Sequence, residues 1–219
     1  MSREVHHLGQ ANSLIALALS EMRDVTVQGD RLRFRHNLVR LGEMMAYEIS
    51  RQLEYVAVDV ETPLGTARCP ALRDQPVLAT ILRAGLPLHQ GMLNAFADAD
   101  NAFISAYRKH HDDDDEFDVE IEYLSSPSID GRLVILCDPM LATGSSMVLA
   151  WKALLKLGTP RHTHVAAAIA SEQGVAFARD NLPENTTYWL GAVDPDLNSK
   201  AYIVPGLGDA GDLAFGAKE

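Results

Sequence analysis

The chain has 219 residues, of which 47% are hydrophobic and 22% charged, and its formal net charge is −11. These proportions are those of a globular protein and exclude a disordered chain, and the acidic balance argues against a nucleic-acid-binding surface. Two distant cysteines, Cys69 and Cys137, make no disulfide framework, and no apolar run reaches the ~18 residues of a membrane span. We expect one domain over residues 1–219, without a secretory signal and located in the reducing cytoplasm, with no nucleic-acid or membrane partner.

Residues 1–60 are expected to be helical up to a β-branched stretch near their end. Apolar residues recur on successive turns from Ala11 to Met22, and at spacings of three and four from Arg31 to Leu53. Val56–Val60 alternates, then a turn and Thr66–Cys69 follow, which predicts a hairpin. The second helix carries four arginines that could bind an anion, but for most of them we favour a solvated helix face: Arg31, Arg33, Arg35 and Arg40.

The next strand is predicted at Val77–Leu82, followed at once by Arg83, Ala84 and Gly85 and by a helix from about Pro87. A guanidinium and free amides would then stand at the carboxyl edge of a sheet, where open α/β sheets bind ligands. The alternative is an ordinary turn with a surface arginine.

A further strand at 102–107 ends in Arg108, and 107–124 is expected to form a protruding hairpin. Its tip holds two histidines and the acidic run Asp112–Glu116. We interpret this run as solvated charge rather than as a metal site, because contiguous ligands cannot all converge on one ion. The purpose of the run is not evident from the sequence.

The most informative stretch begins with Leu133–Cys137, an apolar run typical of a strand buried on both faces. Asp138 stands where this strand should end. The small and hydroxylic residues 142–146 follow, and then a helical pattern that stops at Gly158. Loop amides and a helix dipole aimed at one point would cradle a phosphate.

Two familiar phosphate-binding motifs do not fit this cradle. A Walker A loop needs a lysine after its second glycine, and a dinucleotide site needs G-x-G-x-x-G; neither is present. A competing explanation is that Thr143 and Ser146 only cap the helix.

Strands at 164–170 and 186–190, with a helix at 173–181 between them, complete a β-α-β-α-β order. This order predicts a parallel sheet with crossover helices, hence an α/β fold. His162 and His164 alternate with apolar neighbours and are expected to be structural.

Three segments together resemble the uracil phosphoribosyltransferases. They read I-L-R-A-G-L from Ile81, D-P-M-L-A-T-G-S-S from Asp138, and Y-I-V-P-G-L-G-D-A-G-D from Tyr202. Each motif is moderately specific, but the three occur in the family's order and the resemblance covers nearly the whole chain. It implies a type I phosphoribosyltransferase fold: a mainly parallel sheet flanked by helices, an N-terminal helical layer, a hairpin hood and a C-terminal base-binding loop.

The resemblance also implies an activity, the transfer of 5-phosphoribosyl from 5-phosphoribosyl 1-pyrophosphate (PRPP) to uracil, which gives UMP and pyrophosphate. Asp138, Arg108 and Asp209 would be catalytic, and Asp209 would contact Mg2+, itself held mainly by PRPP. The residues implied for PRPP are Arg83, Ala84, Gly85, Arg108, Asp138, Pro139, Met140, Leu141, Ala142, Thr143, Gly144, Ser145, Ser146 and Asp209. Those implied for uracil are Tyr202, Ile203, Gly208, Asp209 and Ala210.

Two residues depart from the family's pattern. Ser145 replaces the second glycine of T-G-G-S and would be strained if this position needs a positive φ, or would add a hydroxyl contact if it does not. Leu213 replaces a basic residue. Alternatives to the main interpretation are a phosphoribosyltransferase for another base, such as xanthine or orotate, a non-catalytic nucleotide-sensing regulator, and an inactive paralogue. The family's homodimers or homotetramers and its GTP effector are implied only by the resemblance.

Overall fold

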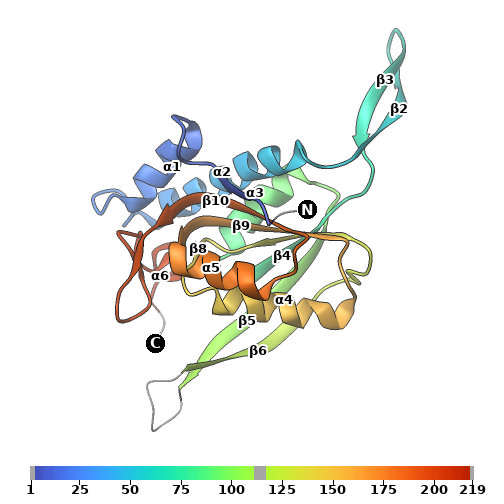
Figure 1. Ribbon diagram of the computed structural model, residues 1–219. Helices are drawn as coiled ribbons and strands as arrows, with labels where there is room; N and C mark the ends of the chain where they lie inside the picture. Colours follow the sequence, from blue (N-terminus) through green and yellow to red (C-terminus); the bar gives the residue numbers. More distant parts are fainter. Residues whose placement is uncertain (1–2, 111–116, 218–219) are drawn as a thin grey trace.

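The computed structural model describes residues 3–110 and 117–217, with the side chains of residues outside 106–121. A central sheet has the strand order β1-β10-β9-β7-β4-β5-β6, and the short β8 (Met140–Leu141) adds to β9 (Figure 1). Neighbouring strands run parallel except for the antiparallel pair β5 and β6. The strands are β1 (Val5–His7), β4 (Val77–Leu82), β5 (Asp100–His110), β6 (Phe117–Ser125), β7 (Leu133–Cys137), β9 (His162–Ser171) and β10 (Thr186–Asp194).

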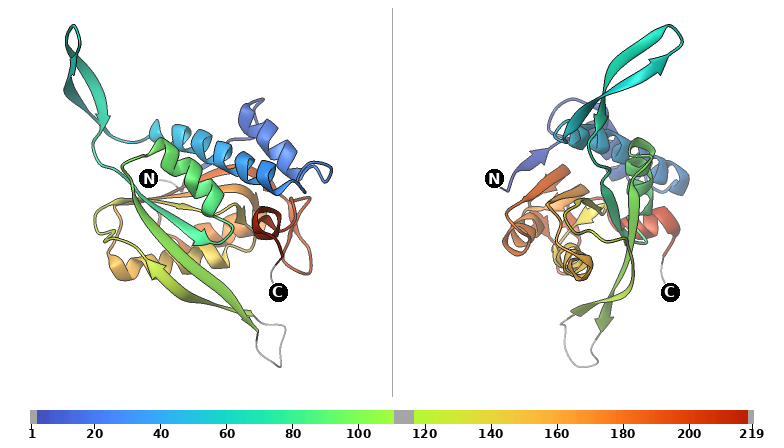
Figure 2. Two further views of the ribbon diagram at one scale, coloured as in Figure 1. Left: turned by 180° about the vertical axis from the view of Figure 1, so that it is seen from behind. Right: turned by 90° about the vertical axis from the view of Figure 1, so that its right-hand side faces the viewer.

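Helices cover both faces of this sheet (Figures 1 and 2). One layer consists of α1 (Leu14–Arg23), α2 (Arg31–Ser50) and α3 (Leu86–Ala95), and the other of α4 (Ser145–Leu154), with a 3-10 turn at Leu155–Leu157, and α5 (Glu172–Asn181). The central strands are apolar on both sides because both sides are covered. Leu78 and Ile135 pack under the first layer, while the alternating Val77 and Val134 pack under the second. The predicted α/β architecture is confirmed.

The predicted helices are present with slightly different ends. Ser13 caps α1 by accepting a hydrogen bond from Ala16 N–H, and Asp30 caps α2 through Leu32 and Arg33 N–H. On α2, Arg33 pairs with Glu21, and Arg35 donates to a carbonyl of the C-terminal helix α6 (Ala210–Phe215), so its arginines serve packing as well as solvation. Among the helices of the described residues, none combines the length and apolarity needed to cross a bilayer.

The expectation that the chain starts as helix is wrong at β1, which extends the sheet beside β10. The ring of His6 stacks on Trp189, with centroids 4.0 Å apart, and Trp189 Nε1 donates to His164 Nδ1 at 3.0 Å. Burial, with the neighbouring His162 and His6, lowers the pKa of His164 to about 3. His164 is therefore a neutral core residue, and its expected structural role is confirmed.

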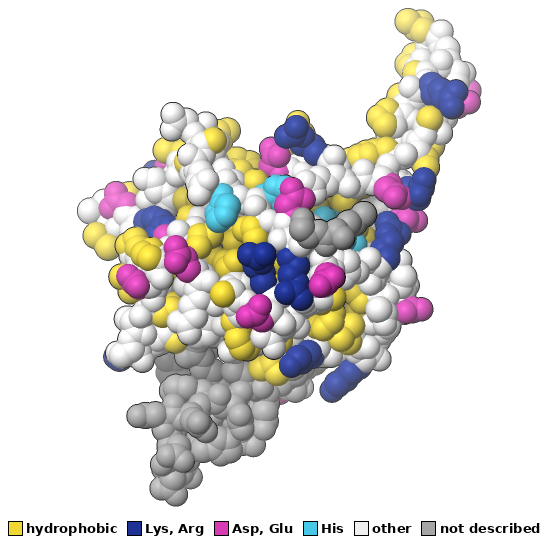
Figure 3. Space-filling view, viewed as in Figure 1, with side chains coloured by type: hydrophobic (Ala, Val, Ile, Leu, Met, Phe, Trp, Pro, Cys, Tyr) yellow, Lys and Arg dark blue, Asp and Glu magenta, His cyan; other side chains and the backbone are white. Residues whose placement is uncertain are grey.

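The hairpin predicted near Val56 is confirmed and longer than expected. Strands β2 (Tyr55–Thr62) and β3 (Gly65–Leu72) pair antiparallel and project from the body as an arm (Figures 1 and 2). Val56, Val58 and Val60 alternate along one face of this arm and are exposed, and hydrophobic side chains line it in Figure 3. A two-stranded hairpin of this kind is marginally stable alone in water.

The second predicted hairpin is formed by β5 and β6, which pair from Phe103 and Ser125 out to His110 and Phe117. It projects beyond the sheet on the opposite side of the body from the arm (Figure 2). The acidic run Asp112–Glu116 lies outside the described residues.

Candidate active site

The two loops that the sequence singled out lie next to each other because β4 and β7 are neighbouring parallel strands. Thr80 and Cys137 are paired across them, so Arg83 and Asp138 leave the sheet at the same carboxyl edge. A cavity of about 200 Å³ opens there. Its lining residues are Ile81, Leu82, Arg83, Ala84, Asp138, Met140, Leu141, Ala142, Thr143, Gly144, Ser146, Met147, Ala201, Tyr202, Asp209, Ala210 and Gly211.

The Arg83 loop is tightly packed between strand and helix. The peptide bond between Leu82 and Arg83 is cis. A Cβ on Gly85, which caps α3, would lie 2.1 Å from Thr80 Oγ1, so only glycine fits. The guanidinium of Arg83 reaches the C-terminal helix, where Nη2 donates to Asp212 Oδ1 at 3.1 Å and to Gly216 O at 2.7 Å.

Asp138 directly follows Cys137, the last residue of β7. Its N–H donates to Ala166 O of β9, which fixes its backbone at the carboxyl edge of the sheet. Its side chain lines the cavity and accepts a long hydrogen bond from Met140 N–H at 3.4 Å. Burial, together with the charge of Asp209, outweighs that hydrogen bond and raises the pKa of Asp138 to about 7. A carboxylate so poorly solvated is suited to accept hydrogen bonds from a ligand.

The phosphate cradle is shaped by Gly144, which has φ +83° and precedes the first residue of α4. A Cβ at Gly144 would lie 2.9 Å from Gly174 O, so glycine is needed for space as well as for φ. Gly144, the N-cap residue, offers no side-chain cap, but Thr143 Oγ1 accepts a hydrogen bond from Ser145 N–H at 3.3 Å, so the predicted capping by Thr143 is partly present. The amides of the first turn beyond Ser145 can face an anion.

Ser145 is not at a positive φ, so it is not strained. It is the first residue of α4, and its hydroxyl accepts a hydrogen bond from Thr143 Oγ1 at 3.1 Å. The loop at Ala142 is fixed by Ser171, whose Oγ donates to Ala142 O and accepts from Gly174 N–H. The cradle is thus held by contacts to two helices.

The C-terminal segment closes the cavity from the side. The pair β11 (Asp196–Leu197) and β12 (Ile203–Val204) is followed by a cis Val204–Pro205 peptide and by Gly206 and Gly208, both at positive φ. Asp209 caps the short α6, its Oδ1 accepting from Asp212 N–H at 2.9 Å.

Most of the residues predicted for the site are brought together in this cavity. Those that lie in the same loops without lining it are Gly85, Pro139, Ser145, Ile203 and Gly208. The backbone of Arg108 belongs to β5, opposite Val119, and its side chain lies outside the described residues.

Several residues at the site were not anticipated. Ala201 lines the cavity at φ +60°, and nothing in the sequence marks an alanine for that conformation. Asp212 holds Arg83, and its position in G-D-A-G-D was the available signal. Arg23 and Asp194 form an ion pair behind the C-terminal loop; they are 171 residues apart, and no local pattern links them.

Known proteins resemble this chain along its length. The family model described as uracil phosphoribosyltransferase matches residues 10–217. A protein of Porphyromonas gingivalis named uracil phosphoribosyltransferase is 57% identical over 215 residues, covering 98% of this chain and 99% of that protein. One of the same name from Pyrobaculum arsenaticum is 43% identical over 187 residues, covering 84% and 87%.

Solved structures agree on the fold. A protein from Aquifex aeolicus superposes with a TM-score of 0.86 at 29% identity, covering 98% of this chain and 99% of its own. The orotate phosphoribosyltransferase of Mycobacterium tuberculosis, solved with PRPP, gives a TM-score of 0.52 at 16% identity over 86% and 95% of the two chains, a likeness of fold alone. The fold is that of the type I phosphoribosyltransferases, and with its three motifs on one cavity the chain belongs to the uracil phosphoribosyltransferase family.

Proposed function

We propose that this cavity, in a single domain of 219 residues, transfers 5-phosphoribosyl from PRPP to uracil and releases UMP and pyrophosphate. Membership of the family makes the chain a pentosyltransferase. The observation that carries the proposal is the meeting of three loops on one cavity, since Arg83, Asp138 with the cradle, and Asp209 all line it. Each loop has chemistry suited to a different part of the two substrates.

PRPP would lie along the carboxyl edge of the sheet. The 5-phosphate would accept hydrogen bonds from the amides and hydroxyls of residues 142–146 at the start of α4, and Asp138 would accept from the ribose hydroxyls. Arg83, with the Ala84 amide and with Arg108 of the hood, would hold the pyrophosphate, because a guanidinium matches phosphate oxygens in pairs. The Gly85 amide, also predicted for this role, already donates to Ile81 O at 3.0 Å.

Uracil would be recognised mainly through hydrogen bonds to the main chain of the C-terminal loop. Its edge alternates acceptor, donor and acceptor, and the main chain of Ile203 and of Gly208 to Ala210 can present the complementary groups. Tyr202 borders the same cavity. Gly206 and Gly208 at positive φ turn this backbone away from regular pairing.

Mg2+ is the expected cofactor. Asp138 and Asp209 place two carboxylates at the cavity, and Mg2+ is commonly held by one or two carboxylates together with substrate phosphates. Asp209 would contact it, and PRPP would supply the other oxygens. When bound, the ion supplies charge that neutralises the departing pyrophosphate.

The reaction breaks the bond between ribose C1 and the pyrophosphate oxygen, and forms a bond from C1 to N1 of uracil, which loses its proton. Positive charge develops on the ribose during this exchange. The residues of the site would act by positioning the two substrates and by stabilising charge, so that no protein nucleophile is needed. The β5–β6 hood stands where it could cover the donor and exclude water.

Assembly is proposed on different grounds. The arm exposes Val56, Val58 and Val60 on one face and Leu64 at its tip, and the outer side of the helical layer exposes Leu14. Surfaces of this kind favour contact with a second copy, as a homodimer or homotetramer. A cytoplasmic location and a GTP effector remain predictions that rest on the family.

The test is an assay with uracil, PRPP and Mg2+ that measures UMP and pyrophosphate, run beside xanthine, orotate and buffer without magnesium. We expect UMP from uracil only and a loss of activity on chelation of magnesium. Product from another base, with none from uracil, would reassign the substrate. No product with any base would overturn the enzymatic proposal.

A further inference from the structure

Behind the C-terminal loop lies an ion pair that the proposed reaction does not use. Arg23 is the last residue of α1 and Asp194 the last residue of β10. The pairing is bidentate, with Arg23 Nη1 to Asp194 Oδ2 and Nη2 to Oδ1 both at 2.7 Å. Asp194 is only 6% exposed. A forked pair whose carboxylate is buried has one geometry and holds its neighbours to it.

The pair also binds the backbone of one residue of the C-terminal loop, Gly206. Arg23 Nη1 also donates to Gly206 O at 2.9 Å, and Gly206 N–H donates to Asp194 Oδ2 at 2.9 Å. Both backbone polar groups of Gly206 are therefore bound by side chains from the body of the protein. Because burial opposes its charge, Asp194 depends on these partners: the Arg23 and Gly206 hydrogen bonds and the Arg23 charge keep its pKa below the usual value.

Gly206 is also the point where the loop turns. Its φ is +60°, and a Cβ there would lie 2.0 Å from Ile203 O, so the chain folds back closely on β12. Ile203 precedes this turn, and Gly208 to Ala210 follow it after one intervening residue, Leu207. Gly206 itself does not line the cavity, so the clamp acts on the loop from behind.

We propose that Arg23 and Asp194 are positioning residues that fix the Gly206 turn and thereby set how the backbone of Ile203 and of Gly208 to Ala210 meets the base. The inference rests on the proposed function of the same loop. It assigns to the N-terminal helix α1 a role in base recognition, although α1 contributes no residue to the cavity.

The informative variants keep size and change only the clamp. Asp194→Asn replaces one acceptor oxygen by a donor and removes the charge, while Arg23→Lys keeps the charge but loses the fork. We expect KM for uracil to rise about tenfold in each, as fits the loss of one charge-assisted hydrogen bond. KM for PRPP and kcat at saturating uracil should change less than about twofold, because the cradle and Asp138 are not touched and the side chain of Asp209 is held separately as the cap of α6.

Binding measured without turnover gives a second readout. UMP, which carries the base, should bind about tenfold more weakly to Asp194→Asn, whereas PRPP alone should bind as it does to the wild type. In the double variant Asp194→Asn with Arg23→Lys, the effects should not add, because both changes break one clamp.

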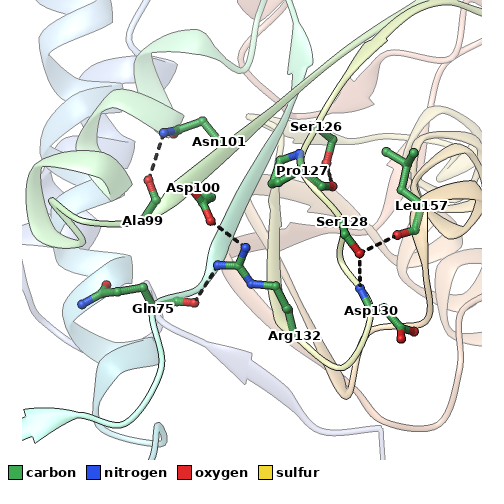
Figure 4. Close-up of polar contacts among 10 residues, drawn as sticks. All are labelled: Gln75, Ala99, Asp100, Asn101, Ser126, Pro127, Ser128, Asp130, Arg132 and Leu157. Atoms are coloured by element: carbon green, nitrogen blue, oxygen red, sulfur yellow. Dashed lines mark hydrogen bonds and ion pairs between the residues drawn. The ribbon is translucent and has the colours of Figure 1, made fainter.

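A matched control lies at the opposite edge of the sheet. Arg132 uses the same chemistry there, with Nη1 donating to Asp100 Oδ2 at 2.6 Å and Nη2 to the backbone oxygen of Gln75 at 3.3 Å (Figure 4). Arg132→Lys and Asp100→Asn should lower the melting temperature at most slightly and leave every KM unchanged.

The outcomes separate cleanly. If wild-type protein makes no UMP, the proposed function fails before the clamp is tested, and UMP binding still reports on the loop. If wild type is active and the clamp variants only lose stability, or lose kcat and both KM values together, the positioning role is overturned and the pair is structural. A selective effect on uracil and UMP supports it.

Discussion

The two edges of the central sheet differ in one carboxylate. Both edges carry arginine–carboxylate pairs, which at the carboxyl edge are Arg83 with Asp212 and Arg23 with Asp194, but the carboxyl edge also holds the poorly solvated Asp138. At the amino edge, arginines meet carboxylates directly. Arg132 pairs with Asp100 at 2.6 Å (Figure 4), and Arg161 pairs with Asp74 at 2.7 Å. At the carboxyl edge, Asp138 accepts one long hydrogen bond from Met140, and its pKa is raised to about 7.

These two arrangements contribute to the free energy of unfolding with opposite signs. Partly exposed ion pairs at the amino edge each contribute only about 0–1 kcal/mol, because solvent screens both charges. At the carboxyl edge a carboxylate is kept poorly solvated, which disfavours the folded state and leaves hydrogen-bonding capacity for a ligand. If this contrast is correct, equivalent substitutions at the two edges should have opposite consequences.

The largest effect is expected from Asp138→Asn. Turnover should fall by about 100-fold or more, because an amide cannot replace a charged acceptor on the ribose. The melting temperature should hold or rise, because the variant buries no charge. Steady-state kinetics and thermal unfolding measure both. Asp100→Asn is the amino-edge control and should leave turnover intact; near wild-type turnover in Asp138→Asn would remove Asp138 from the mechanism.

The next effect is on pH dependence. The ionised form of Asp138 is the one that accepts hydrogen bonds, so kcat/KM for PRPP should fall as pH drops below about 7, by about tenfold per unit. The part of this decrease in kcat/KM that is due to Asp138 should be absent in Asp138→Asn, whereas any pH dependence due to PRPP itself should remain. An unchanged profile in the variant would contradict the assignment.

The free energy of unfolding should depend on pH in the opposite direction to kcat/KM. Between the ordinary carboxyl pKa of 3.8 and about 7, the folded chain holds a proton on Asp138 that the unfolded chain has lost. The contribution of Asp138 to the free energy of unfolding therefore falls as pH rises through this window. Urea titrations at pH 5 and pH 8 should show a smaller difference in Asp138→Asn than in wild type.

A glycine at each edge gives a smaller and sharper test. Gly144→Ala meets both a positive φ and Gly174 O, and should cost about 2–3 kcal/mol and raise KM for PRPP. Gly131, just before β7 at the amino edge, has φ +66° with nothing within 4 Å of a Cβ, so Gly131→Ala should cost only about 1 kcal/mol and leave KM unchanged. Equal effects on KM would contradict the special role of the cradle.

The smallest effect is expected from Ser145→Gly, which restores the family's usual residue. Because Ser145 is not at a positive φ, the change relieves no strain; it removes the hydroxyl that Thr143 donates to and adds backbone entropy. The expected cost is below about 1 kcal/mol, with little change in KM for PRPP. A clear gain in PRPP affinity would indicate that the serine obstructs the cradle.

What the sequence predicted and what it missed follow from the range of the forces involved. Val77–Leu82 and Leu133–Cys137 were predicted because strands buried on both faces are apolar throughout, and Arg83 and Asp138 were found because they follow those strands. The two- and three-residue strands have no periodicity to detect. The Arg23–Asp194 clamp is a long-range contact that only the folded chain brings together.

The stacking of His6 on Trp189 has a practical consequence for following this protein in solution. The chain contains two tryptophans, and they lie on opposite faces of the sheet: Trp189 belongs to the core under α1 to α3, and Trp151 of α4 packs against the core under the other layer. Each layer therefore has its own intrinsic fluorophore. Replacing either tryptophan by phenylalanine would leave an emission signal from one layer alone, Trp189 responding when β1 leaves the sheet edge and Trp151 when the helix that begins at the phosphate cradle moves.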